Sequence, residues 1–373
     1  VAAAMLTRGT KTMTRSEIED RMTELKMAGS ITNFTTTRKN LPAALELVFD
    51  AMHNSIMPQD EFDQFKKQMQ VMIESMRDKP DALAQNAITQ HFNTYPKGDP
   101  RYEYSLDESL EQLNKLTVDQ VRAFYKEFGG TSRGEISIVG DFDPKAVEKI
   151  IRDDYAKYVS KAHYAPVVTE YRPVKATRVV IDTPDKENAI IVARSVFPIN
   201  DTAPDAPALT VANWILGGGT GLSNRLIERL RQKEGLSYGA GSHVRIPAKG
   251  DNGSFVFRAI VAPQNMLQAE ASARDVIAKA IKDGFTDQEV EEAKKGLLQA
   301  MQVARSQDDV VARSWNDKME NQRTWAFSKK QAEAISKLTT ADVNAALRKY
   351  IKPDEITFVL AGDQKKASQK KQD

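Results

Sequence analysis

The chain has 373 residues, of which 41% are hydrophobic and 28% are charged, and it contains no cysteine. Its 53 basic and 51 acidic residues give a formal net charge of +2, a balance that argues against nucleic acid or a membrane surface as the main partner. The lack of cysteine excludes disulfides and thiolate metal sites, and no apolar run reaches the roughly 18 residues that a membrane span needs.

The first half of the chain has mainly helical patterns. Val1–Leu6 resembles the last turns of a helix, so we expect this sequence to begin inside a structural element. Thr14 followed by Glu17 is the signature of a capping box at a helix start. Ser30–Arg38 is β-branched and alternating, which predicts a strand. Further helices are expected at 41–53, 60–77, 80–92, 105–113, 117–128 and 144–158, and a strand at Gly134–Gly140.

The second half mixes strands with helices. Residues 161–176 contain tyrosines and prolines without a period, which predicts a linker. The lysine-rich end, residues 365–373, is expected to be a disordered tail. Between them the patterns predict strands at 178–182, 189–197, 236–239, 253–261 and 356–362, and helices at 206–216, 265–283, 287–305, 308–322, 328–338 and 340–350.

One stretch, Leu216–Val244, combines the most unusual features of the chain. Three consecutive glycines, Gly217, Gly218 and Gly219, end an apolar segment. A basic amphipathic helix is expected to follow, with Leu222, Leu226 and Leu230 on one face and Gly235 at its end.

Two polar residues of this stretch are candidates for function. Arg231 lies near the end of the predicted helix, and Tyr238 lies early in the strand that follows, so the turn between them places the two within reach of each other. Taken alone, they would be an ordinary surface arginine and strand tyrosine. The glycines would likewise be a structural turn, since a P-loop lysine and the G-x-G-x-x-G spacing are both missing.

The two halves of the sequence resemble each other. Leu113–Phe128 matches Ile335–Tyr350 at an offset of 222 (335 − 113), and a Gly-Asp pair follows the same distance behind each copy. Upstream, Glu61 matches Glu289 at an offset of 228 (289 − 61). This duplication predicts two homologous domains, residues 1–160 and 177–364. The first is expected to lack its opening strand and most of its first helix.

The second half is similar to the closing, non-catalytic domain of the pitrilysin/insulinase/mitochondrial-processing-peptidase family of zinc metallopeptidases. The resemblance implies an α+β fold of two homologous domains, each a mainly antiparallel sheet with helices packed on one face. The matching residues are Gly217-Gly218-Gly219, Ser223-Asn224-Arg225-Leu226 and Leu230–Tyr238.

Members of this family bind zinc through H-x-x-E-H on a helix, which this chain does not contain. When the family pattern is laid on Met5–Thr10, the second histidine falls on Ala4 and the water-activating glutamate on Ala3. The distal glutamate ligand would fall near Glu74. Since alanine can neither bind zinc nor move a proton, we expect no catalytic residue, no metal and no cofactor in this chain.

The resemblance therefore implies a substrate-binding half of a zinc metalloendopeptidase. Arg231, Tyr238 and the glycines 217–219 would contact the peptide, because an arginine and a tyrosine can polarise a carbonyl or hold its oxyanion. The zinc would belong to a catalytic H-x-x-E-H domain, either on a partner subunit or in a segment missing from this sequence. The alternatives are a proteolytically inactive scaffold of the same family and a nucleotide-binding protein that uses the glycine run.

Further expectations follow from the same resemblance. The partners would be the catalytic domain and a peptide substrate, with a homo-oligomer also possible and with neither nucleic acid nor a membrane span. A periplasmic or secreted location is expected because bacterial relatives of this type are often exported, and a cytoplasmic one stays open.

Overall fold

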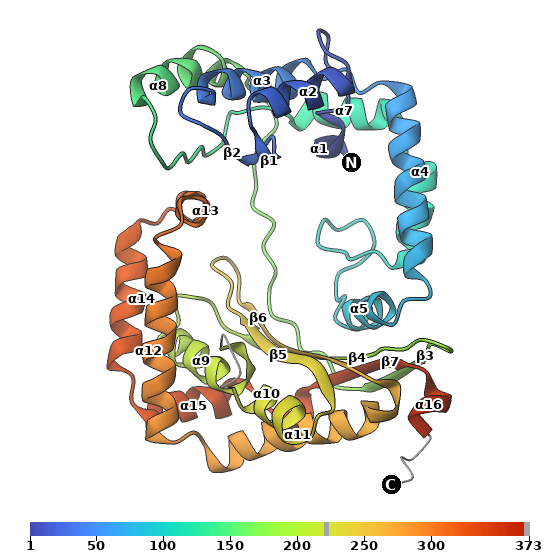
Figure 1. The fold of residues 1–373 in the computed structure, drawn as a ribbon, viewed down its shortest axis with the longest axis vertical. Helices are drawn as coiled ribbons and strands as arrows, with labels where there is room; N and C mark the ends of the chain where they lie inside the picture. The colour runs from blue at the N-terminus through green and yellow to red at the C-terminus, as the bar shows by residue number, and fades with distance from the viewer. Residues whose placement is uncertain (220–223, 369–373) are drawn as a thin grey trace. The chain divides into compact units, whose positions relative to one another are not determined.

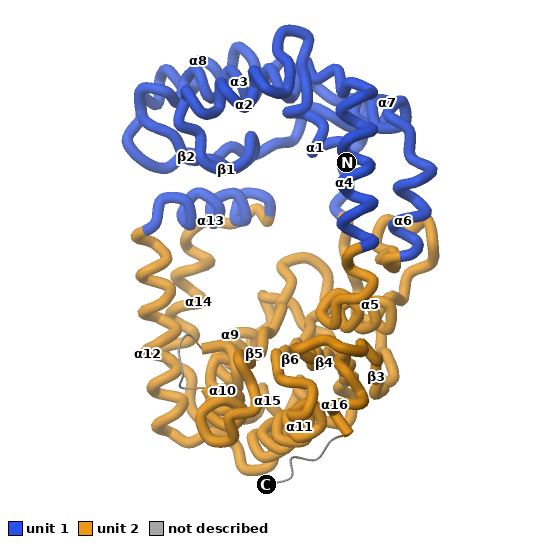
Figure 2. The backbone as a smooth tube through the Cα atoms, turned by 45° about the vertical axis from the view of Figure 1, so that its right-hand side comes forward, with its two compact units in different colours: residues 1–74, 107–166, 307–320 blue, residues 75–106, 167–306, 321–373 orange. Residues whose placement is uncertain are grey.

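The computed structural model describes residues 1–219 and 224–368, which form two compact units. Unit 1 comprises Val1–Glu74, Asp107–Pro166 and Gln307–Glu320, and the rest of the chain belongs to unit 2 (Figure 2). The chain passes from unit 1 to unit 2 at residue 167, inside the predicted linker 161–176. Each unit also includes a segment from the other half of the sequence, so the two units do not coincide with the predicted domains 1–160 and 177–364. Those domains stay a prediction.

The first half of the chain is helical, as its patterns predict. Thr14 begins α2 with the expected capping box, in which Glu17 N and the Thr14 side chain are hydrogen-bonded, and Thr117 caps α7 in the same way. The helices bury an apolar core that includes Met5, Leu45 and Phe62. The elements are α1 (Ala2–Met5), α2 (Arg15–Glu24), β1 (Ala28–Ser30), β2 (Asn33–Thr35), α3 (Leu41–Asn54), α4 (Gln59–Met76), α5 (Pro80–His91), α6 (Leu106–Lys115), α7 (Val118–Phe128), α8 (Pro144–Asp153) and η1 (Tyr155–Lys157).

Two strand predictions in this half are wrong. Ser30–Arg38 is not one strand, because the chain turns back at residues 31–32 and pairs β1 with β2 as a short antiparallel hairpin. Gly134–Gly140 forms no strand at all. A strand needs a neighbour to pair its backbone groups. In the described part of unit 1 the only sheet is the β1–β2 hairpin, so this segment has none.

The centre of unit 2 is a five-stranded sheet with the order β3-β7-β4-β6-β5 (Figure 1). β3 pairs with β7 in parallel, and the other three pairs are antiparallel, which confirms the predicted mainly antiparallel sheet for this half. The strands are β3 (Arg178–Asp182), β4 (Ala189–Pro198), β5 (Ser237–Arg245), β6 (Asn252–Val261) and β7 (Thr357–Gly362).

Helices cover this sheet on both faces, whereas helices on one face were expected. The larger core, with Phe255 and Phe257 fully buried, lies between the sheet and the helices of the second half. On the opposite face, α5 packs Ala84 and Ile88 against the sheet. The strand β4 explains this second layer, because its run of apolar residues is buried on both sides.

The remaining elements of the second half follow their predicted positions, except at the C-terminal end. Residues 364–368 form α16, where part of a disordered tail was expected, because Asp363 accepts a hydrogen bond from Lys366 N and Ala367 is buried. Residues 369–373 of the predicted tail lie outside the described residues. The helices are α9 (Ala206–Asn213), α10 (Arg225–Ile227), α11 (Met266–Asp283), α12 (Asp287–Ala304), α13 (Asp308–Glu320), α14 (Trp325–Lys337), α15 (Thr340–Tyr350) and α16 (Gln364–Ser368), with short turns η4 (Pro263–Asn265) and η5 (Pro353–Glu355).

No helix within residues 1–219 and 224–368 is long and apolar enough to cross a membrane.

The internal repeat is visible as a repeated contact. Lys66 Nζ on α4 donates to the carbonyl of Leu116 at 3.0 Å, and Lys294 Nζ on α12 donates to the carbonyl of Leu338 at 2.8 Å. These lysines and these leucines are the residues that the offsets of 228 and 222 pair. The next residue begins a capped helix in both cases, at Thr117 and at Thr339.

Candidate functional site

The glycine run lies at the end of a helix that is pressed against the edge strand of the sheet. α9 continues into η2 (Trp214–Gly218), a turn of π-helix in which Gly219 N donates to Trp214 O at 3.0 Å. A Cβ on Gly217 would come within 2.5 Å of Ser242 Oγ and 2.8 Å of Ser242 N on β5. A side chain at Gly217 therefore has no room beside this strand.

The next two glycines are equally confined. A Cβ on Gly218 would overlap the amide nitrogen of Asn213, and one on Gly219 would lie 3.0 Å from Trp214 O. Asn213 itself bonds to β5, since it accepts from Ser242 Oγ at 2.8 Å. β5 thus leaves no room for a side chain at Gly217, while the preceding turn, through Asn213 and Trp214, crowds Gly218 and, less tightly, Gly219.

A second π-helical turn carries the predicted arginine. The segment after the glycines begins at α10 and continues as η3 (Glu228–Lys233), and Leu226 and Leu230 are fully buried beneath it as predicted. Leu222 and Ser223 lie outside the described residues. Gly235 ends the turn with a φ of +60°, the left-handed conformation expected of a helix-terminating glycine. π-helical turns are rare and occur often at functional sites, and here two of them flank the same short segment.

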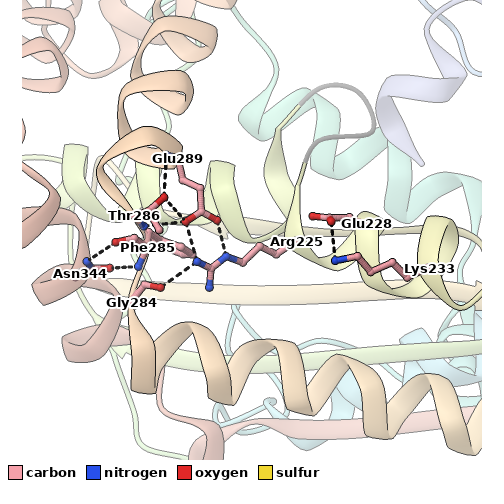
Figure 3. Close-up of polar contacts among 8 residues, drawn as sticks. All are labelled: Arg225, Glu228, Lys233, Gly284, Phe285, Thr286, Glu289 and Asn344. Atoms are coloured by element: carbon pink, nitrogen blue, oxygen red, sulfur yellow. Dashed lines mark hydrogen bonds and ion pairs between the residues drawn. The ribbon is translucent and has the colours of Figure 1, made fainter.

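Arg225 holds this segment to the body of unit 2 (Figure 3). Its guanidinium makes two parallel bonds to Glu289, at 2.7 and 2.8 Å, and donates to Gly284 O at 3.0 Å. Its guanidinium carbon also lies 4.7 Å from the centre of the Phe285 ring. Because these three hydrogen bonds and the Phe285 ring hold its guanidinium, Arg225 is a structural residue of the motif.

The pKa of Glu289 shows the same attachment. Burial alone would raise this pKa, but the hydrogen bonds from Arg225 and from the Thr286 backbone hold it below its ordinary value. The carboxylate therefore stays charged at neutral pH and keeps its bonds to Arg225.

Arg231 and Tyr238 have very different surroundings. Arg231 is exposed on η3, and Tyr238 is 66% exposed at the second position of β5. Among the described residues, neither side chain makes a hydrogen bond or an ion pair. The pairing of β5 with β6 is irregular between Ser237 and Gly239, so Tyr238 lies in a bulge that turns it out of the regular alternation.

The structure places these two residues on one short connection. Leu236 N donates to Leu230 O at 2.8 Å, which fixes the path from the π-helical turn into β5. Arg231 and Tyr238 lie on either side of that bond and remain available to a ligand, but no contact joins their side chains to each other.

The structure also describes the positions at which the family pattern would carry zinc ligands. Ala3 and Ala4 are exposed on α1, and Glu74 is exposed on α4. Within the ranges 1–219 and 224–368, no group of three or more histidine, aspartate or glutamate side chains could hold a metal ion. The absence of metal and cofactor in the intact protein stays a prediction.

Comparison with known proteins finds a matching family model and several relatives. Residues 115–297 match the family model of the peptidase M16 inactive domain. An uncharacterized zinc protease of Mycobacterium tuberculosis is 24% identical over 299 residues, which cover 77% of this chain and 66% of the relative. A relative from Helicobacter pylori named as a non-peptidase homolog is 20% identical over 69% of this chain and 58% of its own length. The matches thus span two thirds or less of these relatives.

Solved structures share the fold. The peptidase M16 inactive domain from Pseudomonas fluorescens superposes with a TM-score of 0.80 and 21% identity, covering 97% of this chain and 86% of the other. The periplasmic protease PqqL from Escherichia coli has a TM-score of 0.67 and 15% identity, with 96% of this chain matching 40% of that protein. These likenesses confirm the mixed α/β fold.

Proposed function

Because this chain carries an inactive domain of the peptidase M16 family, as the sequence motif predicts, we propose that it is the non-catalytic, substrate-binding half of a zinc metalloendopeptidase. In this proposal an H-x-x-E-H domain, on another subunit or another segment, holds the zinc ion. The observation that carries it is the contrast between Arg225, which three hydrogen bonds tie to the body of unit 2, and Arg231 and Tyr238, which are exposed and make no hydrogen bond or ion pair among the described residues.

The chemistry of the two exposed residues suits a peptide bond. A guanidinium presents several donors in a fixed plane, and a phenol presents one directional O–H donor. Both can donate to a carbonyl oxygen, and both bonds strengthen as that oxygen gains negative charge during attack on the peptide bond. In the proposed role, Arg231 and Tyr238 hold the substrate carbonyl while the partner domain supplies the metal and the base.

The glycines would act through the backbone. Gly217 lets η2 lie directly against Ser242 of β5, the strand that carries Tyr238. A side chain at Gly217 would push these two elements apart and displace the peptide site with them.

A scaffold without proteolytic role is the second candidate, and one comparison favours it. The Helicobacter pylori relative is named as a non-peptidase homolog. Under this reading the chain would assemble with partners through the same fold, and Arg231 and Tyr238 would be ordinary surface residues.

The variant Tyr238→Phe distinguishes the two. We expect kcat of an assembly formed with an H-x-x-E-H partner protein to fall by about 10²-fold, because one oxyanion donor is lost. Zinc content, measured by mass spectrometry, should not change. Tyr164→Phe is the matched control, since Tyr164 is also exposed but stacks with Arg133 in unit 1.

Arg231→Ala provides an independent check, with Lys233→Ala as its control on the same turn. Lys233 is exposed and pairs with Glu228 at 2.8 Å, so its loss should leave turnover nearly unchanged. Equal turnover in the wild type and both site variants would contradict the substrate-binding role and favour the scaffold.

A further inference from the structure

One face of the unit 2 sheet carries charged residues beyond the helix that covers it. α5 packs over β3, β7 and β4 on this face (Figure 1). Ile190 and Val192 of β4 point toward α5, and alternation along the strand puts Arg194 on the same face. Arg194 therefore lies next to an apolar layer, where an arginine is unexpected.

Arg194 is held in place without any polar partner. Its guanidinium carbon lies 4.8 Å from the centre of the Phe92 ring, at the end of α5. Its Nε atom is inaccessible to water and has no hydrogen-bond acceptor. No ion pair or hydrogen bond to its other nitrogens occurs in the described part of the chain. Burying a charged donor without an acceptor costs free energy, so this side chain is stored in an unfavourable state.

A second arginine faces the same region from the edge strand. Arg194 is aligned with Val256 on β6, and Val256 with His243 on β5. Arg245 follows two residues after His243, so it lies on the same face, exposed and also without a partner among the described residues. The register thus puts Arg194 on β4 and Arg245 on β5 on the same face, with β6 between the two strands. Burial lowers the pKa of Arg194, and the positive charge of Arg245 lowers it further.

Nearby charges do not neutralise this pair. Glu103 is close enough to act on Arg194 electrostatically, yet its carboxylate forms no ion pair with it. On the same face, Arg258 is neutralised by Asp81 at 2.6 Å. Arg194 and Arg245 are thus two cations on one face that have no ion pair among the described residues, whereas Arg258 on that face has one.

We propose that Arg194 and Arg245 form a carboxylate-binding site that receives an acidic group of the peptide substrate. A carboxylate can accept two parallel bonds from a guanidinium, here from the two terminal nitrogens of Arg194, and its charge would offset the repulsion between the two cations. The peptide's C-terminal carboxylate and an Asp or Glu side chain offer the same chemistry. The inference rests on the proposed function only in taking a peptide as the ligand.

Binding to the purified chain tests this site without any catalytic partner. The probes are a fluorescent, unstructured Glu-rich peptide and its Gln counterpart, each with a free or an amidated C-terminus, followed by fluorescence anisotropy. We expect the Kd of acidic probes to rise about tenfold in Arg194→Gln and in Arg245→Gln, since one charge-assisted bond is lost in each. Arg258→Gln removes the same charge from the same face and should change Kd less than twofold.

The probe series also separates the two sources of the carboxylate. A loss of binding on amidation assigns the site to the C-terminus, and a loss on Glu-to-Gln exchange assigns it to side chains. Equal Kd values for the Glu-rich probe with a free C-terminus and the amidated Gln probe, or equal effects of Arg245→Gln and Arg258→Gln, would overturn the proposal. Arg245 is exposed, so its variant keeps the test valid if Arg194→Gln does not fold. This test measures binding to the isolated chain, whereas the proposed function is tested by turnover of the assembly, so failure of one and failure of the other are distinguishable.

Discussion

Two long helices, α4 in unit 1 and α12 in unit 2, show how far the two copies of the repeat agree. Each has 18 residues. The third residue is a glutamate that pairs with an upstream arginine, as Arg8 with Glu61 at 3.0 Å and as Arg225 with Glu289 at 2.7 Å. The eighth residue is the lysine that binds the carbonyl before the next capped helix. Helix length, ion pair and lysine contact are therefore shared.

The copies differ in what these helices surround. The second copy has a five-stranded sheet, whereas the described part of the first has a two-stranded hairpin. Two buried carboxylates, Glu270 and Asp363, lie in unit 2, and none is buried in the part of unit 1 that the structure describes. The unpaired Arg231, Tyr238, Arg194 and Arg245 also belong to unit 2.

This comparison teaches which residues to regard as structural. A polar contact present in both copies, such as that of Lys66 and of Lys294, is part of the frame. A polar residue that only one copy carries, and that its own unit leaves unpaired, is a candidate for binding. Arg225 and Arg231 lie six positions apart (231 − 225) in one motif, yet by these criteria Arg225 is structural and Arg231 is a candidate for binding.

A substitution of Glu270 is expected to change the stability of unit 2 relative to unit 1 the most. It is buried on α11 and binds Arg178 at 2.7 Å and Arg274 at 2.9 Å, so Glu270→Gln leaves two cations without their anion. We expect unit 2 to lose about 3 kcal/mol of stability while unit 1 changes little. Hydrogen exchange resolved by peptide measures each unit separately. Asp275→Asn on the same helix, in a partly exposed pair with Lys279, is the control and should cost below about 1 kcal/mol.

In acid, unit 2 of the wild-type protein should lose stability before unit 1 does. Burial would raise the pKa of Glu270, but the hydrogen bonds from Arg178 and Arg274 hold it below the ordinary value of 4.5. Its stabilisation is therefore complete above about pH 4.5 and is lost as the pH falls below that value. Hydrogen exchange, corrected for its intrinsic pH dependence, should show unit 2 opening first. Equal acid sensitivity of both units would break the contrast.

A smaller difference is expected between the two equivalent lysines. Lys294 is 8% exposed, and Lys294→Met leaves the Leu338 carbonyl without that donor, at a cost of about 2 kcal/mol. Lys66 is only half-buried, so water can replace it, and Lys66→Met should cost about 1 kcal/mol. Urea unfolding of both variants gives the two values. A larger loss of stability in Lys66→Met than in Lys294→Met would contradict the expectation that the more buried lysine contributes more.

The frame of the molecule could be predicted from sequence because its signals are local. The capping box at Thr14 depends on neighbouring residues alone, and the structure confirms it. The strand expected at Gly134–Gly140 failed because pairing depends on a distant neighbour, which local alternation cannot reveal.

The residues of the candidate site could be predicted from the sequence only in part. The motif identified Arg231, Tyr238 and the glycines, but it did not separate the engaged Arg225 from them, since only tertiary contacts do so. Asn213 and Ser242, which pack against the glycine run, carry no sequence signal, and local sequence could not reveal that Arg194 lacks a hydrogen-bond partner. Its sequence signal was a single charge in the apolar run of β4.

The most direct test of the central claim, that this chain binds peptide and holds no metal, is zinc content together with peptide cleavage, measured on the purified chain and again after adding the H-x-x-E-H partner. The account predicts no stoichiometric zinc and no cleavage by the chain alone, and cleavage once the partner is present. Stoichiometric zinc in the isolated chain, or cleavage without the partner, would contradict it.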